Sequence, residues 1–390
     1  MNVLLSVDTV RAPLTGPGRY AYELARHLPA QAGIEAMYYH DALEGLLSAQ
    51  ALERRAEGAV PSPLRRHSAR AWRLAHRLAA GLGRRFSLSL PKRRRRRWPN
   101  SQRLLAHGPA FTLPLFGRRR VVTIADLSVL KFPQFHPTLR IKVVGHDIER
   151  ALAEADHLLT FSAFTRQELI EELGCAPERV TAVPLAATAD FRPRPPAEVA
   201  PVLARYGLGC RGYCLSVGTI EPRKRIEVLL DAFETLPAPL QTRYPLVLIG
   251  DAGWLSRPTH TRIAALERAG RARYLGYVPQ DTLPLLYNGA AACLYTSIYE
   301  GFGLPAVEAM ASGAALIATR AASLPEVCAD GAVLVAVDDA EAIGAALQGL
   351  LEDEDTARAL AAAGVAAAGR FGWPRTAAET VAVYRRVAQS

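Results

Sequence analysis

The chain has 390 residues, half of them hydrophobic, and its 47 Lys or Arg against 37 Asp or Glu give a formal net charge of +10. This length and composition suit two domains with sizeable cores and exclude a disordered chain. The five cysteines contain no CxxC pair and stand at no zinc-site spacing, so we expect no metal centre. The opening "MNVLLSVDTV" lacks a basic leader region, and no apolar stretch approaches the about 20 residues that span a bilayer. We therefore expect a cytoplasmic protein.

The first segment of the chain reads as a strand, a turn and a helix. The run "NVLLSV" predicts the strand, "LTGPG" the turn, and "RYAYELARHL" the helix, an order typical of a βαβ unit. Gly16 and Gly18 lie in the turn, where they can open a helix start to an anion or simply allow an ordinary turn. Neither a full G-x-G-x-x-G nor a Walker A sequence is present.

The positive charge is concentrated in residues 54–103, which hold sixteen Lys or Arg and one acid, Glu57. Apolar residues between Ala71 and Phe86 recur at steps of three and four, with most arginines off that stripe, so the segment predicts a basic amphipathic helix. Such a helix is typical of an interface with anionic lipids, although it could also pack on its own domain with a solvated basic face. Arginine runs also neutralise nucleic-acid phosphates, but no aromatic residues are interleaved for base stacking, and we expect no nucleic-acid partner.

From Arg120 onward, short apolar runs alternate with helical patterns, which predicts βαβ units and a parallel sheet. A break comes at residues 191–201, "FRPRPPAEVAP", where four prolines disfavour both a helix and a central strand and predict a linker. Two α/β domains of similar length fall on either side. The predicted strands are "RVVTIA", "HLLTFS", "YCLSVG", "YPLVLIG", "RYLGYV", "ACLYTS", "ALIAT" and "AVLVAV".

A glycine-rich turn between two glutamates follows the predicted strand "ACLYTS". In "YEGFGLPAVEAM", residues 299–310, the turn 301–304 brings backbone N–H groups to a helix start, and Pro305 suits the first helical turn. Anions bind at helix starts, and ligands of open parallel sheets bind at this edge. Glu300 and Glu308 flank the turn, and carboxylates are good acceptors for sugar hydroxyls. The stretch therefore suits a ligand that joins phosphate to a polyol.

A second stretch, "TIEPRKR", follows the predicted strand "YCLSVG". Gly218 permits a tight turn, and Arg223 and Lys224 stand at the predicted start of the next helix. Two cations at the end of a neighbouring strand can neutralise a diphosphate and stabilise it as a leaving group. Alone, such a stretch is usually a solvated helix start; together with the two glutamates it indicates a nucleotide-sugar site.

These residues resemble the retaining glycosyltransferases of family 4. The resemblance lies in "SVGTIEPRKRIEVLLDAF" and "YTSIYEGFGLPAVEAMASGAALIAT", and "TGPGRYAYELARHL" and "VVTIADLSVLKFPQFHP" resemble the mannosyltransferase-like branch. It implies an α/β GT-B fold of two Rossmann-like doubly wound domains facing across a cleft. The implied acceptor-side domain is residues 1–192, with the basic insertion at about 54–103. The implied nucleotide-sugar domain is 197–370, and a C-terminal helix, 371–390, crosses back to the first domain.

The same resemblance implies an activity and its partners. We expect retaining, metal-independent transfer of a mannose- or rhamnose-type hexose from a GDP-sugar to a lipid-linked or polysaccharide acceptor, without a cofactor. The basic segment suggests an enzyme peripheral on the inner membrane face. A UDP-sugar donor and a soluble acceptor, as in a sugar-phosphate synthase, stay open. By the motif match, the expected catalytic residues are Glu300, Arg223, Lys224 and Asp126, and the expected donor-binding residues are Gly16, Gly18, Gly218, Tyr277, Val278, Gly301, Phe302, Gly303, Leu304 and Glu308.

One position departs from the family pattern. The strand "VVTI" is usually followed by His-Asp, whereas this chain has Ala125-Asp126. The histidine would face the transferred sugar from the acceptor side. Its replacement leaves donor binding untouched but keeps open a third alternative, a nucleotide-sugar-binding protein with impaired catalysis.

Overall fold

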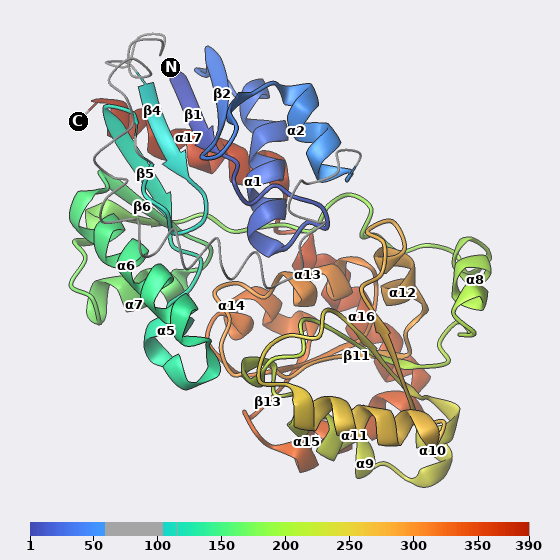
Figure 1. Cartoon of the computed structure of the whole chain (residues 1–390). Coiled ribbons are helices and arrows are strands. Elements are labelled where there is room, and N and C mark those ends of the chain that lie inside the picture. The colour runs from blue at the N-terminus through green and yellow to red at the C-terminus, as the bar shows by residue number, and fades with distance from the viewer. Residues whose placement is uncertain (59–103, 115, 390) are drawn as a thin grey trace. The chain divides into compact units, whose positions relative to one another are not determined.

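The computed structural model describes residues 1–58, 104–114 and 116–389 (Figure 1). Contacts between residues divide it into two compact units. The first comprises Met1–Ile124, Leu139–Leu159 and Ala377–Ser390, and the second comprises Ala125–Thr138 and Thr160–Thr376. Each unit is built around one predominantly parallel sheet, and the two are described in turn.

The first sheet has the strand order β3-β2-β1-β4-β5-β6-β7. All its printed pairings are parallel except β2 with β3, where Tyr39 pairs with Leu47 in an antiparallel hairpin that the sequence did not predict. The Asp41 side chain closes that hairpin, because its Oδ1 accepts from the backbone N–H groups of Leu43 and Glu44 at 2.9 and 3.0 Å. The strands are β1 (Asn2–Ser6), β2 (Ala36–Asp41), β3 (Gly45–Leu47), β4 (Leu104–Gly108), β5 (Arg119–Thr123), β6 (His157–Thr160) and β7 (Val180–Ala182).

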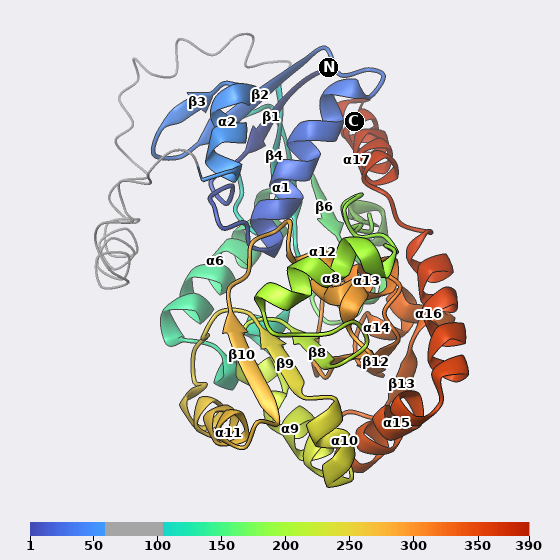
Figure 2. The ribbon, with the colours of Figure 1, turned by 90° about the vertical axis from the view of Figure 1, so that its right-hand side faces the viewer.

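The helices of this region follow the predicted alternation. The predicted helix is present, but it begins at Gly16, so Gly16 and Gly18 lie in the first turn of α1 and not in a turn before it as predicted. Figures 1 and 2 show the N-terminus and the end of α17 at the same end of the first unit. The bounds are α1 (Gly16–His27), η1 (Leu28–Ala30), α2 (Ala49–Ala56), α5 (Ser128–Lys131), η4 (Pro133–Phe135), α6 (Thr138–Glu154), α7 (Ala163–Glu171), η5 (Pro177–Arg179) and α17 (Trp373–Gln389).

The predicted basic amphipathic helix lies outside the described residues. Of the segment that begins at Arg54, only residues 54–58 are described, and the first three of them belong to α2. The guanidinium of Arg55 is buried, with Nη2 at 3.0 Å from Asp41 Oδ2 and 2.9 Å from Glu44 Oε1. Arg55 is therefore part of the folded unit and is not available to a membrane surface.

The second sheet has the strand order β10-β9-β8-β11-β12-β13, and all its printed pairings are parallel. Taken in chain order this is 3-2-1-4-5-6, the doubly wound arrangement in which the winding reverses between the first and fourth strands. The reversal here falls between β8 and β11. The strands are β8 (Cys214–Val217), β9 (Leu246–Ile249), β10 (Ala272–Gly276), β11 (Ala292–Tyr295), β12 (Leu316–Thr319) and β13 (Val333–Val335).

Helices cover both faces of the second sheet (Figures 1 and 2): α9, α10, α11 and α15 gather on one side, and α12, α13, α14 and α16 on the other. Leu229 and Phe233 of α9 and Ile343 of α15 are fully buried against Leu246 and Ile317 of the sheet. The bounds are η6 (Pro222–Lys224), α9 (Ile226–Glu234), α10 (Ala238–Arg243), α11 (Arg257–Arg268), α12 (Leu283–Gly289), α13 (Leu304–Ala311), α14 (Leu324–Cys328), η7 (Ala329–Gly331), α15 (Ala340–Glu352) and α16 (Glu354–Ala368).

The proline-rich stretch at 191–201 corrects one prediction. A helix, α8 (Pro196–Arg205), begins within it and contains Pro201. Pro196 occupies the first helical position, where a missing N–H costs nothing. Pro201 lies inside the helix, where it removes one intrahelical hydrogen bond. Val199 and Leu203 are buried, and this packing outweighs the loss.

A buried polar network joins four elements of the first unit. His107 of β4 is fully buried; its Nδ1 lies 2.6 Å from the Tyr384 hydroxyl of α17, and its Nε2 lies 2.8 Å from Thr123 Oγ1 of β5. The Tyr20 hydroxyl of α1 lies 3.1 Å from the same Thr123 oxygen. Burial lowers the pKa of His107 to about 3. The imidazole is therefore neutral in the folded protein at ordinary pH.

This pKa predicts an acid-sensitive contribution to stability. Between pH 6.5 and 3 the unfolded chain binds a proton at His107 that the folded chain does not. The contribution is therefore fully present above pH 6.5 and falls with decreasing pH, by at most about 1.4 kcal/mol per pH unit. Urea unfolding at pH 7, 6 and 5 should show a shallower loss of stability for His107→Gln than for the wild type. The exposed His146→Gln serves as the control, and equal slopes for His107→Gln and the wild type would contradict the assignment.

Candidate active site

The reversal point of the second sheet brings two of the predicted stretches together. The loop after β8 carries Arg223 and Lys224, and the loop after β11 carries Glu300. Because β8 and β11 are parallel neighbours, both loops leave the sheet at its carboxyl edge. Ligands of doubly wound sheets bind in the crevice at this point.

The two cations lie on a short turn and not on the helix that the sequence predicted. η6 (Pro222–Lys224) holds them, Arg225 then adopts a left-handed conformation with φ of 51°, and α9 begins at Ile226. The guanidinium of Arg225 forms two bonds, of 2.6 and 2.5 Å, to the Asp338 carboxylate. This ion pair helps to hold an uncommon backbone conformation for a residue with a side chain.

Glu300 forms the centre of a buried ionic cluster. Its Oε1 lies 2.5 Å from Lys224 Nζ and 3.0 Å from Arg223 Nη1. Lys224 Nζ also lies 2.9 Å from the Tyr295 hydroxyl. Arg223 Nη2 donates to Glu221 Oε1 at 2.6 Å. The predicted residues Arg223, Lys224 and Glu300 therefore lie together. Glu221, two positions before Arg223, also belongs to the cluster and was not predicted from the sequence.

The charges of this cluster balance. Two carboxylates, Glu221 and Glu300, face two cations, Arg223 and Lys224. Burial alone would raise the pKa of Glu300, but Arg223 and Lys224 more than offset it and lower the pKa to about 2. Burial and the neighbouring Arg223 charge lower the pKa of Lys224, although Glu300 opposes them. Glu300 therefore stays ionised at any pH at which the protein works.

Two polar atoms of the cluster have no hydrogen-bond partner among the described residues. They are Nε of Arg223 and Oε2 of Glu221, and both are buried. Buried polar groups in proteins are nearly always paired, and exceptions concentrate where a ligand or a solvent molecule completes the set. The cluster thus has capacity for further hydrogen bonds with a polar ligand.

The glycine-rich turn packs too closely for larger residues. A Cβ at position 301 would lie 1.8 Å from the Ala125 carbonyl oxygen and 2.9 Å from Asp126 Cβ, both in the same unit. Gly303 directly precedes α13 and has φ of 95°, a left-handed backbone conformation that favours glycine. Phe302 is buried against the Phe371 ring at 5.3 Å between centroids. Only its backbone remains for a ligand.

Asp126 lies next to this turn. Its Oδ1 accepts from the Ser128 N–H at 2.8 Å, and its charge interacts with Arg223. Ala125, where the resemblance led us to expect histidine, presents only a methyl group. Of the pair Ala125-Asp126, only Asp126 therefore has a side chain that can form hydrogen bonds or carry charge.

The remaining predicted donor residues lie in several places. Glu308 is buried on α13, with 4% of its surface exposed. Gly218 follows β8 with the Lys224 side chain in ordinary contact, and Leu304 begins α13. After β10, Val278 is buried whereas Tyr277 is 54% exposed. These residues belong to the second unit.

Gly16 and Gly18 belong to the first unit, at the start of α1. A Cβ on Gly18 would lie 2.5 Å from the Thr9 carbonyl oxygen, so close packing alone accounts for that glycine. A Cβ on Gly16 would meet nothing within 4 Å, so its surroundings have room for a ligand. Of the two glycines, only Gly16 therefore has space around it that favours a role in ligand binding.

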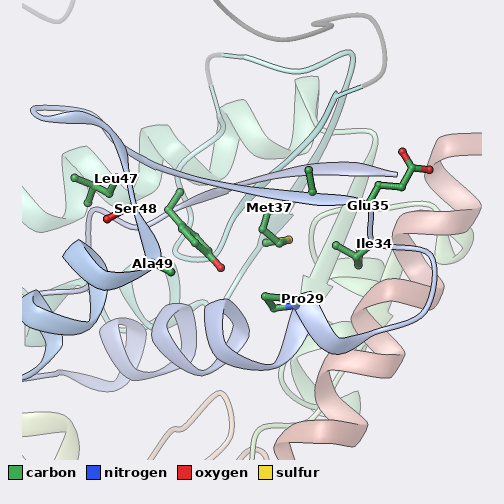
Figure 3. Close-up of a pocket in the computed structure, with 9 residues that line it drawn as sticks. Pro29, Ile34, Glu35, Met37, Leu47, Ser48 and Ala49 are labelled. Atoms are coloured by element: carbon green, nitrogen blue, oxygen red, sulfur yellow. The ribbon is translucent and has the colours of Figure 1, made fainter.

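The first unit also contains a hollow of about 380 Å³ between the end of α1 and the β2–β3 hairpin (Figure 3). Its wall is mainly apolar, with Ile34, Met37 and Leu47 among the lining residues. Glu35, the one carboxylate among its described lining residues, is exposed and pairs with the N-terminal amine at 3.1 Å. No cation is found among those described lining residues, so they do not suit a phosphate. Among the described residues, no three His, Cys, Asp or Glu side chains gather to hold a metal ion.

The comparison with known proteins agrees with this site. The family model "Glycosyl transferases group 1" matches residues 211–366. The O-antigen chain mannosyltransferase B of Escherichia coli is 34% identical over 393 residues, covering 99% of this chain and 100% of the relative. The chain belongs to the group 1 glycosyltransferases. The predicted family is confirmed: the protein is a glycosyltransferase, a class that uses a nucleotide-sugar donor and a glycan acceptor.

Solved structures confirm the predicted fold class. Sucrose-phosphate synthase from Thermosynechococcus elongatus matches with a TM-score of 0.69 and 20% identity, covering 100% of both chains. Anabaena HepE, in complex with UDP and glucose, matches with a TM-score of 0.68 and 17% identity, covering 99% of both. The chain therefore has the α/β GT-B fold with two Rossmann-like domains.

We expect Gly301→Ala to lower transferase activity at least about 100-fold, because the new Cβ forces the turn away from Ala125 and shifts the Glu300 carboxylate. Activity and melting temperature would be measured side by side. Gly349→Ala is the matched control: position 349 is exposed on α15 with open space around it, and the change should raise stability by up to about 1 kcal/mol. Full activity in Gly301→Ala would contradict the proposed role of the turn.

Proposed function

We propose that this chain transfers a mannose-type hexose from a GDP-sugar to a membrane-associated glycan during polysaccharide or lipopolysaccharide assembly, with retention of the anomeric configuration. The observation that carries the proposal is the Arg223–Lys224–Glu300 cluster at the reversal point of the second sheet. The choice of sugar is supported by the full-length similarity to an O-antigen chain mannosyltransferase. A UDP-sugar donor is the alternative.

The cluster suggests how each group acts. Arg223 and Lys224 neutralise the diphosphate as the bond between the sugar C1 and the β-phosphate oxygen breaks. An acceptor hydroxyl oxygen forms the new bond to C1 on the same face, and the leaving phosphate takes the hydroxyl proton. The products are an α-glycoside and GDP. Glu300 accepts from hydroxyls of the transferred sugar, and Glu308 from the ribose.

Other groups complete the proposed donor site. The backbone of residues 301–304 supports the phosphates and the sugar at the start of α13. The exposed ring of Tyr277 is free to stack on the nucleobase, with Val278 behind it. Gly16, which has open space at its Cα, suits an approach of the first domain to the phosphates, and Gly18 lies in the same first turn of α1.

Glu300 must also share its cations with the donor. Both Arg223 and Lys224 already pair with its Oε1, so an incoming diphosphate competes with the carboxylate for them. Once phosphate oxygens replace it, Glu300 becomes available as an acceptor for sugar hydroxyls. Donor binding and placement of the catalytic carboxylate are thereby linked in one exchange.

Ala125 supports a second candidate function, nucleotide-sugar binding with little turnover. The methyl group cannot donate a proton or a hydrogen bond to the sugar. Asp126 is retained beside the turn, and we include it with Arg223, Lys224 and Glu300 in the catalytic set. The donor experiment below separates the two functions.

We further propose residues 1–192 as the acceptor domain, 197–370 as the donor domain and 371–390 as a helix returning to the acceptor domain. Among the described residues, no helix is long and apolar enough to cross a membrane. Fifteen of the sixteen cations of residues 54–103, all but the buried Arg55, support attachment to an anionic inner membrane face instead. Such attachment would place the enzyme beside a lipid-linked acceptor.

We predict that GDP raises the melting temperature of the wild type, whereas UDP and ADP do not. A nucleotide at a hundred times its dissociation constant adds about 2.7 kcal/mol to the stability of the state that binds it. Lys224→Ala should lose the shift, and the exposed Lys142→Ala should keep it.

A shift with UDP alone would establish the alternative donor. No shift with any nucleotide would reject the donor site, and GDP binding without GDP release from GDP-mannose in the presence of lipid-linked glycan would favour the impaired form.

We also predict that the intact protein sediments with phosphatidylglycerol vesicles at low salt and less so as salt rises, because screening weakens the attraction. Replacing the five arginines of residues 93–97 with serine should reduce the bound fraction. Phosphatidylcholine vesicles provide the uncharged control. No binding of the wild type to anionic vesicles would sink the membrane proposal.

A further inference from the structure

Tyr299 is a buried residue that contacts both Arg223 and the segment that carries Asp126. It directly precedes Glu300, and 3% of its surface is exposed. Its carbonyl oxygen accepts from Arg223 Nη1 at 2.6 Å. Its hydroxyl oxygen accepts from the Leu127 N–H at 3.1 Å, one residue beyond Asp126. One residue thus contacts both the diphosphate cation and the segment that carries the aspartate.

A carboxylate fixes the direction of that hydroxyl. Glu168 of α7 is buried, and its Oε2 accepts from the Tyr299 hydroxyl at 2.5 Å. A phenol has one proton, so donation to Glu168 leaves only lone pairs for the Leu127 N–H. Lys131 Nζ lies 2.5 Å from Glu168 Oε1 and also pairs with Glu172 at 2.7 Å, so it offsets part of the charge of the Glu168 carboxylate. Lys131, Glu168 and Tyr299 therefore form one chain of directed bonds.

Packing fixes the Tyr299 ring itself. The Phe132 ring lies 5.4 Å away and the Phe164 ring 6.0 Å away, between centroids. Burial, with Glu168 beside it, raises the pKa of Tyr299, so the phenol keeps its proton. The hydroxyl is then a fixed point from which the backbone at Leu127 is held.

We propose that Tyr299 and Glu168 are positioning residues of the transfer reaction, which hold Asp126 in register with Arg223 and Glu300. The inference rests on the proposed function. It assigns a role to Tyr299, which lies in the matched stretch but received no role from it, and to Glu168, which lies outside the matched stretches. Neither side chain needs to touch the substrate: they act through the backbone at Leu127 and through the direction of the Tyr299 hydroxyl.

The test is Tyr299→Phe, which keeps the ring and the carbonyl bond to Arg223 but removes the hydroxyl. We expect kcat to fall about tenfold to a hundredfold because Asp126 is no longer held, while the dissociation constant for GDP changes by less than about twofold. Tyr213→Phe is the matched control, since it also removes a buried hydroxyl bond, 2.5 Å to the Leu286 carbonyl, in the same unit. It should leave kcat within about twofold of the wild type.

Glu168→Ala breaks the same link from the other end and should show the same split between kcat and GDP affinity. The kcat of the double variant should be no lower than that of the less active single variant, because both substitutions break the same chain of hydrogen bonds. Unchanged kcat in Tyr299→Phe, or equal losses of kcat and GDP affinity, would overturn the inference.

Hydrogen exchange at the Leu127 amide gives a readout that does not need turnover. It should be faster in Tyr299→Phe than in the wild type or Tyr213→Phe, and equal exchange rates would overturn the inference. A wild type that transfers no sugar would contradict the proposed function instead, and the exchange measurement would still decide whether Tyr299 holds this segment.

Discussion

The carboxylate of Glu300, buried between Lys224 and Arg223, is the interaction on which the rest of the site depends. Burying either cation alone would be costly, and breaking a buried pair by removing one partner typically costs about 3–5 kcal/mol. Glu221 supplies the second negative charge and keeps the cluster neutral. The two carboxylates therefore offset the burial of two cations in the protein interior. The cations are already in place for a diphosphate that brings its own charge.

The doubly wound sheet makes this cluster possible. Glu221, Arg223 and Glu300 follow two neighbouring parallel strands, so short loops suffice to bring them together. Gly301 then lets the turn approach the Ala125 backbone, and Tyr299 ties the Asp126 segment to the same turn. Each group is held by backbone geometry as well as by its partners. Such a supported arrangement can keep transition-state charges stabilised without reorganisation.

The sequence alone was sufficient to predict the residues that follow strongly apolar strands. The nine predicted strands are present, and Arg223, Lys224 and Glu300 meet as expected because the strand order of a doubly wound sheet is regular. Tyr299 and Glu168 escaped notice because their bond joins residues 131 positions apart, which no local pattern records.

Strands with weaker patterns were also missed. The β2–β3 hairpin depends on side-chain bonds from Asp41, and β4 carries the buried polar residue His107, which interrupts its apolar run. The prolines of α8 were misread because position within a helix decides their cost, and packing of Val199 and Leu203 then decides the outcome. Local propensity predicted a linker where tertiary contacts favour a helix.

The most direct test of the central claim is a crystal structure of the protein with bound GDP. We predict that the β-phosphate lies within hydrogen-bonding distance of both Arg223 and Lys224, with the Glu300 carboxylate displaced from Lys224 and turned toward the space where the sugar would lie. A nucleotide bound elsewhere, with the Lys224–Glu300 pair unchanged at 2.5 Å, would contradict it.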